Sequence, residues 1–239
     1  MKRSTIGWTD FSGGDLNVVI GCTPASEGCA HCYARAIIAG RGGRDFSKVT
    51  CYPDKLKRLR TAAFSDKGCE YRRGAGSKPM AFAIDLGDLF HPDVTDDFAS
   101  VAASVFASRA DVDWQLLTKR PERAAGRAFP GNVWVGVSVE GPRYLDRLDR
   151  LREIVAGVRF VSFEPLLGPV EPDLTGIDWV IVGGESGTDR RPFNVEWARV
   201  LRDRCAAAGV AFFYKQGSGR WPGMDDVLDG QTYKAWPAR

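Results

Sequence analysis

Three cysteines lie within eleven residues near the start of the sequence, at Cys22, Cys29 and Cys32. The spacing C-x6-C-x2-C puts three soft sulfur ligands on one short loop, and thiolates are ligands that iron–sulfur clusters and zinc prefer. Three thiolates can hold three irons of a [4Fe–4S] cluster and leave one iron open to a substrate or cofactor, as in an open catalytic metal site. We expect Gly21 and Gly28 to let the loop pass close to this inorganic core.

Zinc is the alternative metal for these three cysteines. It would take His31 as a fourth ligand, or a second pair formed by Cys51 and Cys69. His31 adjoins Cys32, and neighbouring residues rarely point at one ion, while Cys51 and Cys69 lack a C-x2-C partner. We therefore favour the iron–sulfur cluster, and we expect Cys51, Cys69 and Cys205 to be ordinary thiols. No secretory signal precedes the motif, so disulfides are not expected.

The rest of the sequence alternates between short apolar runs and amphipathic stretches. The runs predict strands near residues 17–21, 80–85, 113–118, 132–138, 159–164, 178–183 and 210–215. Most of them lack strict alternation, as expected for strands buried on both faces. The stretches between them predict helices near residues 33–40, 54–64, 95–109, 121–127, 143–156 and 195–208. Asn194 and Gly209 are suitable caps for the last of these helices.

Alternating strands and helices of this kind predict an α/β protein with a parallel sheet. Six to seven units favour one partial (β/α) TIM-like barrel over residues 1–239, with a C-terminal extension at about 217–239. A doubly wound open sheet is the alternative architecture. Catalytic groups in such folds gather at the carboxyl ends of the strands. The polar and glycine residues that end or follow the predicted strands are Asp85, Asp88, His91, Lys119, Arg120, Ser138, Glu140, Glu164, Gly183, Gly184, Glu185, Lys215 and Gln216.

Composition excludes several classes of protein and leaves others open. With 44% hydrophobic and 26% charged residues, the chain has the values of a globular protein, which excludes wholesale disorder or coiled coil. The net charge of +3 neither indicates nor excludes a nucleic-acid partner. No apolar run approaches the roughly 18 residues that a membrane span needs. We therefore expect a cytoplasmic protein without a membrane partner.

The sequence resembles the radical S-adenosylmethionine superfamily, in which a three-cysteine loop follows the first strand of a (β/α) barrel. His31 matches the position before the last cysteine of that motif, whereas the first spacing of six residues departs from the usual three. The longer spacing is similar to that of a narrower, phage-associated radical-SAM-like family of unknown function. That resemblance covers nearly the whole chain and is carried by Gly21-Cys22-Thr23-Pro24, Gly28-Cys29, Cys32-Tyr33-Ala34, Gly87-Asp88-Leu89-Phe90-His91, Leu117-Thr118-Lys119-Arg120-Pro121, Val133-Trp134-Val135-Gly136-Val137-Ser138-Val139-Glu140, Ser162-Phe163-Glu164-Pro165-Leu166-Leu167-Gly168 and Gly183-Gly184-Glu185-Ser186-Gly187.

The resemblance implies a mechanism as well as a fold. Cys22, Cys29 and Cys32 would hold a [4Fe–4S] cluster whose open iron chelates S-adenosylmethionine. An electron from a donor such as flavodoxin or ferredoxin would cleave the sulfonium and give a 5′-deoxyadenosyl radical, which abstracts a hydrogen atom from the substrate. The implied substrate is a nucleotide or a nucleic acid, DNA or RNA, undergoing modification or repair. The alternative is a non-catalytic iron–sulfur or zinc-stabilised protein that binds nucleic acid or another partner.

The resemblance also implies which residues meet the cofactor. The superfamily's GGE motif follows the second strand, where this sequence has Asp85 and Asp88, so one of these two would contact the methionine amino group. Ser138 and Glu140 are expected at the ribose hydroxyls, and the late Gly183-Gly184-Glu185 is expected near the adenosine or the substrate. His31, Tyr33 and Glu164 complete the expected cofactor-binding set. Expected substrate contacts are Lys119, Arg120, Arg190, Arg191, Lys215 and Gln216.

Overall fold

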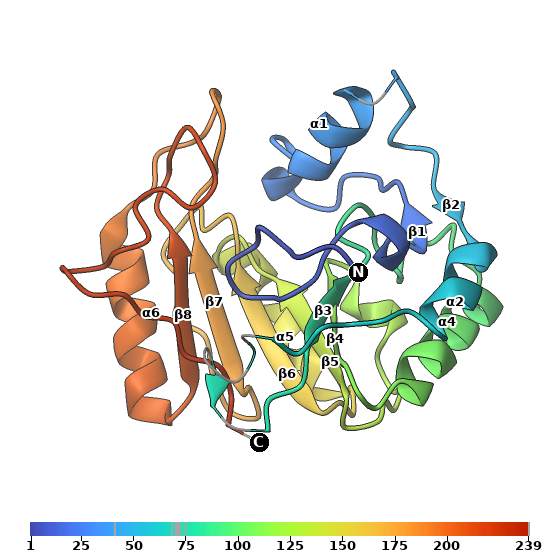
Figure 1. Cartoon of the computed structure of the whole chain (residues 1–239). Coiled ribbons are helices and arrows are strands. Elements are labelled where there is room, and N and C mark those ends of the chain that lie inside the picture. Colours follow the sequence, from blue (N-terminus) through green and yellow to red (C-terminus); the bar gives the residue numbers. More distant parts are fainter. Residues whose placement is uncertain (41, 68, 70–72, 75, 239) are drawn as a thin grey trace.

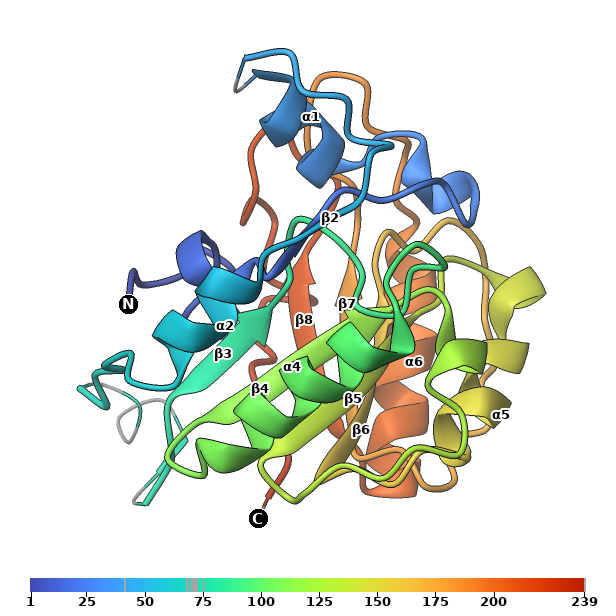
Figure 2. The same ribbon diagram turned by 90° about the vertical axis from the view of Figure 1, so that its right-hand side faces the viewer.

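The centre of the molecule is one sheet of six parallel strands, in the order β3-β4-β5-β6-β7-β8 (Figure 1). Its strands are β3 (Met80–Ala83), β4 (Asp113–Thr118), β5 (Val133–Ser138), β6 (Val158–Phe163), β7 (Trp179–Gly183) and β8 (Ala211–Gln216). This computed structural model describes the chain except for residues 41, 68, 70–72, 75 and 239. Every strand pairs with the next one in sequence, and the sheet curls into a half barrel (Figures 1 and 2). The predicted partial (β/α) barrel is therefore confirmed, because a doubly wound sheet would reverse its strand order.

Three helices cover the outer face of the sheet: α4 (Asp96–Ser108), α5 (Asp146–Arg152) and α6 (Val195–Ala208) (Figure 2). Two more, α1 (Tyr33–Gly40) and α2 (Pro53–Leu59), precede it in the chain. The caps predicted for α6 are confirmed, since the Asn194 side chain accepts a hydrogen bond from the N–H of Glu196 and Gly209 has a left-handed φ of 66°. Among the described residues, no helix is long and apolar enough to cross a lipid bilayer.

The helix predicted at 121–127 is wrong. That segment holds a single 3-10 turn at Pro121–Arg123, and Gly126 leaves helical geometry with a φ of 75°. The helix predicted at 143–156 is shorter than expected, since a separate 3-10 turn at Pro142–Tyr144 precedes α5. Two further 3-10 turns lie at Gly14–Leu16 and Glu27–Cys29.

The strand predicted at 17–21 is also largely wrong. Only β1 (Val19–Ile20) is a strand, and it pairs antiparallel with β2 (Thr50–Cys51) instead of joining the main sheet. The segment still runs beside β3, where a bridge joins Gly21 to Gly87. The positive φ angles of Gly13 and Gly14, 79° and 58°, turn the chain before this segment, so that a continuous ladder with β3 does not form.

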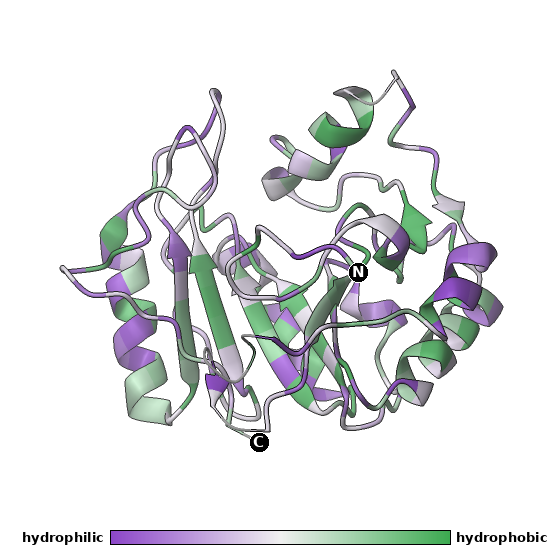
Figure 3. Ribbon diagram, viewed as in Figure 1, coloured by the Kyte–Doolittle hydropathy of each residue, from purple (hydrophilic) through white to green (hydrophobic). Residues whose placement is uncertain are grey.

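The two faces of the sheet have separate apolar cores. The outer face packs against the helices, for example where Phe106 of α4 lies against Trp114 with ring centroids 4.7 Å apart. The concave face buries an aromatic group that includes Trp8, Phe160, Trp179 and Phe213. Figure 3 shows β7 as hydrophobic along most of its length, which fits a strand buried on both faces.

Both edges of the sheet are covered by other segments of the chain. At the β3 edge, the N–H of Phe82 donates to the carbonyl of Phe11 and that of Ile84 donates to Leu16. At the β8 edge, a bridge joins Phe213 to Lys234, and the N–H of Ala235 donates to the carbonyl of Phe212. The backbone groups that an open half barrel leaves unpaired are thus hydrogen-bonded within the chain.

Candidate functional site

The cysteine motif lies on a loop, residues 22–33, which we call the cysteine loop. It crosses the rim of the half barrel, meaning the carboxyl ends of β3 to β8 and the residues that follow them. Side chains that follow four different strands hold this loop: His91 after β3, Arg120 after β4, Glu140 after β5 and Glu185 after β7. The predicted gathering of the motif and of these strand ends on one rim is therefore present.

Arg120 fixes the start of the cysteine loop. Its guanidinium donates to the sulfur of Cys22 at 3.3 Å, and to the carbonyl and hydroxyl oxygens of Thr23 at 2.7 and 3.1 Å. Burial and the charge of Asp88 raise the pKa of the Cys22 thiol, and Arg120 opposes that rise. His91 holds the same turn, with its Nε2 2.8 Å from the Thr23 hydroxyl. The donors of Arg120 point to the cysteine loop, and the contact with substrate expected for it stays a prediction.

Glu140 fixes the middle of the cysteine loop. Its side chain is fully buried, and its carboxylate accepts hydrogen bonds from the Ser26 hydroxyl at 2.5 Å and from Arg147 at 3.0 Å. The ammonium of Lys119 forms a further ion pair with it. A Cβ on Gly28 would lie only 2.5 Å from the Cγ of Glu140. Gly28 thus lets the loop pass close to this carboxylate. The approach of Gly28 to a cluster and the contact of Glu140 with a ribose stay predictions.

His31 and Glu185 fix the end of the cysteine loop. The Nδ1 of His31 lies 3.0 Å from a carboxylate oxygen of Glu185, which also accepts hydrogen bonds from the backbone and guanidinium of Arg191. Burial alone would raise the pKa of Glu185, but the hydrogen bonds from Arg191 and His31 outweigh it and lower the pKa to about 2. Arg191 also donates to the carbonyl of Glu27 at 3.1 Å. The late GGE sequence therefore contacts the cysteine loop itself.

The sulfur of Cys29 sits among hydrogen-bond donors. The N–H of Ala25 lies 3.4 Å from it and the Ser26 hydroxyl 3.7 Å. Burial raises the pKa of the Cys29 thiol, but the Ala25 N–H, the charge of Lys119 and Ser26 outweigh it, so the pKa is lowered. Cys32 is partly exposed and directly precedes α1. Three thiols on one loop, two of them contacted by N–H donors, form a donor set that suits an iron–sulfur cluster.

The other cysteines lie apart from this loop. Cys51 is in β2, Cys69 donates to a buried Asp10 carboxylate at 3.4 Å, and Cys205 is buried in α6. Among the residues that the structure describes, no three His, Cys, Asp or Glu side chains are arranged to hold a metal ion as they stand.

The two carboxylates expected at the methionine amino group hold loops. Asp88 accepts hydrogen bonds from the Thr118 hydroxyl at 2.8 and 2.9 Å, from the N–H of Phe90 at 2.9 Å and from the N–H of Lys119 at 3.3 Å. It thereby ties the end of β3 to the end of β4. Asp85 accepts from the Asn17 side chain at 2.5 Å, and its carbonyl accepts from the Tyr33 hydroxyl at 2.7 Å. Their contact with a bound ammonium stays a prediction.

A second polar group lies farther along the rim. Glu164 after β6 and Lys215 of β8 form an ion pair at 2.8 Å, although β7 lies between their strands. Gly183 makes this reach possible, because a Cβ there would lie 2.6 Å from the carboxylate oxygen of Glu164. Ser138 is buried at the end of β5, and its carbonyl accepts from Arg147. Gln216 is also buried and donates to the carbonyl of Gly184 at 3.0 Å.

Comparison with known proteins assigns the chain to a family. Residues 3–237 match the model of the family described as "Protein of unknown function (DUF5131)". The chain belongs to this family. A search of the curated proteins finds none that matches. Similar solved structures include spore photoproduct lyase complexed with dinucleoside spore photoproduct (13% identity, TM-score 0.43, covering 79% of this chain and 59% of that one) and a cysteine-to-serine mutant of spore photoproduct lyase (13%, 0.46, 85% and 62%). The chain thus spans about three fifths of the length of the solved structures it matches.

Several residues that hold the cysteine loop were not predicted from the sequence. The main one is Arg147, which lies in the predicted helix at 143–156 and was not among the expected site residues. Its spacing of three residues from Tyr144 and four from Leu151 puts it on the apolar side of that helix. An arginine at such a position signals a buried charge partner, which here is Glu140. Ser26 and Thr23 gave no signal, because a hydroxyl in a loop can bond to many partners.

Proposed function

We propose that this protein is an iron–sulfur enzyme of the radical S-adenosylmethionine type that acts on a nucleotide or a nucleic acid. One observation carries the proposal: a loop with three cysteines is fastened across the carboxyl ends of a parallel half barrel by side chains that follow four of its strands. In (β/α) folds this end of the sheet is where catalytic groups gather. Cys22, Cys29 and Cys32 are the proposed ligands of a [4Fe–4S] cluster.

The chain's own residues would prepare and protect this chemistry. A [4Fe–4S] cluster held by Cys22, Cys29 and Cys32 would supply the chemistry, namely one-electron reduction of S-adenosylmethionine to methionine and a 5′-deoxyadenosyl radical, with flavodoxin or ferredoxin as the type of electron donor. Arg120 donates a hydrogen bond to the sulfur of Cys22 and the N–H of Ala25 donates one to the sulfur of Cys29, and these donors would reduce the negative charge on two of the ligand sulfurs. The buried Glu140 group keeps the loop in place.

The Glu164–Lys215 pair is the proposed polar contact for cofactor or substrate. Both side chains are partly accessible, at 14% and 24%, unlike the fully buried carboxylate of Glu140. Arg190 is exposed on the loop after β7, with its guanidinium held at 3.0 Å by the carbonyl of Gly187, and is the proposed contact for a phosphate. Arg191 remains a candidate beside it, although Glu185 already pairs with it.

The test is anaerobic purification followed by iron analysis. A protein with about four irons and an absorbance band near ~400 nm supports the proposal, since a [4Fe–4S] cube has this content. Alanine at Cys22, Cys29 or Cys32 is expected to abolish iron incorporation, because a three-ligand site has no spare ligand, while Cys205→Ala is expected to keep it. Dithionite and S-adenosylmethionine are then added, and 5′-deoxyadenosine is measured by chromatography.

The outcomes separate this function from its alternatives. Bound zinc without iron would leave a zinc-stabilised binding protein. A full cluster without formation of 5′-deoxyadenosine would leave a non-catalytic iron–sulfur protein. Full iron content in Cys29→Ala would refute the ligand assignment itself.

A further inference from the structure

Two loops project together beyond the rim, residues 184–193 after β7 and residues 217–227 after β8. A bridge joins Ser186 to Gly219, and the N–H of Gly187 donates to the carbonyl of Gly219 at 3.1 Å. The Ser218 hydroxyl donates to the carbonyl of Arg191 at 2.8 Å. In Figure 1 these two loops stand side by side above the carboxyl ends of the strands, across the mouth of the half barrel from α1. We call them the paired loops.

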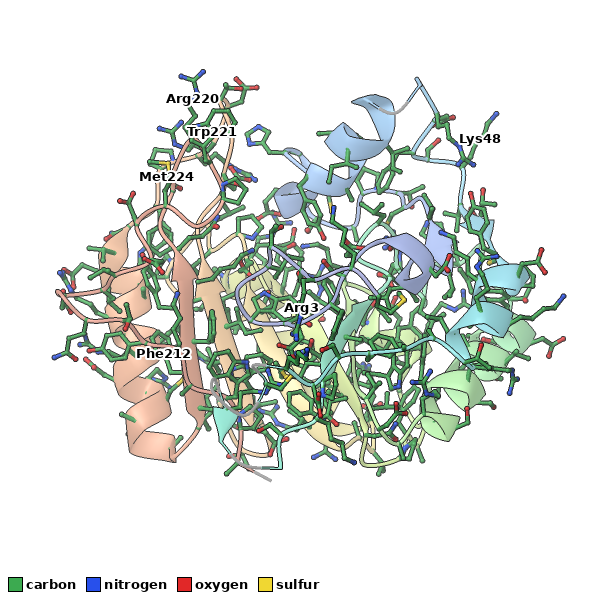
Figure 4. All side chains as sticks on the ribbon, in the orientation of Figure 1. Arg3, Lys48, Phe212, Arg220, Trp221 and Met224 are labelled. Carbon is green, nitrogen blue, oxygen red and sulfur yellow. The ribbon has the colours of Figure 1, made fainter. Side chains whose placement is uncertain are left out.

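The paired loops carry an exposed tryptophan. Trp221 has a relative exposure of 64%, the highest among the exposed large hydrophobic side chains of the described part of the chain. Arg220 places its guanidinium carbon 5.4 Å from the centre of the Trp221 ring, and the sulfur of Met224 accepts the backbone N–H of Trp221 at 3.4 Å. Figure 4 shows Arg220, Trp221 and Met224 together on these loops, at the margin of the molecule. The backbone of Trp221 is thus hydrogen-bonded within the turn, the Arg220 guanidinium lies over the ring, and much of the ring surface stays open.

Packing explains the position of these side chains only in part. The concave core of the sheet already contains Trp8, Trp134 and Trp179, all buried to at least 98%. A Cβ on Gly219 would lie 2.6 Å from the Cβ of Met224, so the turn that carries Trp221 closes tightly on itself. An exposed aromatic ring with a guanidinium beside it is the combination on which unpaired nucleobases stack while their phosphates meet the cation.

The paired loops are also connected to the cysteine loop. Arg191 of the first loop forms an ion pair with Glu185 and donates to the carbonyl of Glu27, and Glu185 contacts His31. Arg190, next to it, is exposed. A nucleic-acid strand with a base on Trp221 would therefore pass close to the cysteine loop at the mouth of the half barrel.

We propose that Trp221 and Arg220 form a stacking platform for an unpaired base of a single-stranded nucleic acid, which lies across the mouth of the half barrel. The inference rests on the proposed function for its substrate class and narrows that class to single strands. Duplex DNA does not fit, because its bases are stacked inside the helix and offer no free face to the ring.

Fluorescence anisotropy with a labelled oligonucleotide tests this platform. The probe is a mixed-sequence single strand of about 12 nucleotides, within the usual site sizes for such proteins. We expect Trp221→Ala to weaken binding about tenfold and Trp221→Phe to keep most of the affinity, since stacking on an aromatic ring contributes about 1–3 kcal/mol per base. Arg220→Gln should weaken binding less and reduce its salt dependence. Val101→Ala on α4, a residue of 51% exposure, is the control for a lost exposed side chain.

The outcomes distinguish this inference from the proposed function. Wild-type affinity in Trp221→Ala would overturn the platform, as would absence of oligonucleotide binding in the wild-type protein or equal competition by a duplex of the same sequence. Iron content and melting temperature of Trp221→Ala, measured alongside, establish that any loss is not misfolding. Trp221-dependent binding without 5′-deoxyadenosine formation would refute the radical chemistry and leave the platform standing, whereas 5′-deoxyadenosine formation without oligonucleotide binding would refute the platform alone.

Discussion

The guanidinium of Arg120 donates a hydrogen bond to the sulfur of Cys22 at 3.3 Å, across 98 positions of the sequence. The same side chain donates twice to Thr23, so three acceptors on one turn of the cysteine loop meet one planar cation. Arginine suits this role because its donors form a rigid fork, which lysine does not have. The turn that presents the first cysteine is therefore positioned from strand β4 and not only by its own sequence.

Arg120→Gln should loosen this turn. We expect the free energy of unfolding to fall by about 1–3 kcal/mol, the range for hydrogen bonds to charged groups. Amide hydrogen exchange at Cys22 and Thr23 in the cluster-free protein, followed by mass spectrometry, should become faster. Arg58→Gln is the control, because Arg58 forms a comparable pair with Asp15 on the surface, where such pairs contribute about 0–1 kcal/mol. Unchanged hydrogen exchange at Cys22 and Thr23 would show that the contact does not hold the turn.

Glu140→Gln keeps the shape of the buried side chain and removes its charge. Lys119 and Arg147 would then lack their carboxylate, and breaking a buried ion pair in this way costs about 3–5 kcal/mol. Urea unfolding should show a loss in this range. Glu153→Gln serves as the matched control: Glu153 also pairs with an arginine, Arg150 at 2.9 Å, but on the surface, so its loss should stay below about 1 kcal/mol. Equal losses in the two variants would contradict the assigned role of Glu140.

Gly28→Ala should push the cysteine loop away from Glu140. The added Cβ would meet the Cγ of Glu140 at 2.5 Å, which the buried carboxylate cannot avoid without breaking its hydrogen bonds. Overpacking of this kind typically costs about 1–3 kcal/mol, and we expect lower iron incorporation as well as lower stability. Gly141→Ala is the control, because a Cβ there meets nothing within 4 Å and its extended φ of −176° is open to any residue. Normal stability and iron content in Gly28→Ala would show that the loop can shift freely.

Acid should weaken the contact between Glu185 and its partners. The pKa of Glu185 is lowered to about 2 from an ordinary value of 4.5, so its contribution is fully present above pH 4.5 and is lost as the pH falls toward 2. The shift corresponds to roughly 3 kcal/mol at most. Between pH 5 and about pH 2, the stability of the wild-type protein should therefore fall more steeply than that of Glu185→Gln, as followed by urea unfolding at each pH. Identical pH slopes would contradict this role for Glu185.

Most of the sheet could be predicted from the sequence, because its strands are buried on both faces and read as continuous apolar runs. Val133–Ser138 and Trp179–Gly183 are of this kind. Helix α6 was equally clear, since its caps and its apolar spacing agree. The pairing of the first strand could not be predicted, because Val18, Val19 and Ile20 give the same apolar pattern whether they join the main sheet or pair with Thr50–Cys51. Only the glycine turn ahead of them distinguishes the two arrangements.

The sequence identified the residues of the candidate site better than the contacts that those residues make. The three cysteines and the polar strand ends were named, since residue type and spacing identify them. The partner of Glu140 was not, because Ser26 lies 114 positions away and nothing in either local sequence indicates the contact. Contacts of this range depend on how the cysteine loop folds back over the sheet, which local patterns do not encode.

The coverage of both sheet edges protects the molecule against strand pairing with other copies of itself. A half barrel that ended in bare strands would offer β3 and β8 as templates for strand addition, which leads to fibrils and domain exchange. Here the stretch from Phe11 to Leu16 lies along one template, and Tyr233 and Ala235 bond along the other. The chain thus completes its own sheet without closing the barrel. A closed barrel would protect its strands but narrow the opening at the rim, and a sheet with bare edges would keep the opening but promote association between copies. This chain keeps the opening and still protects both edges.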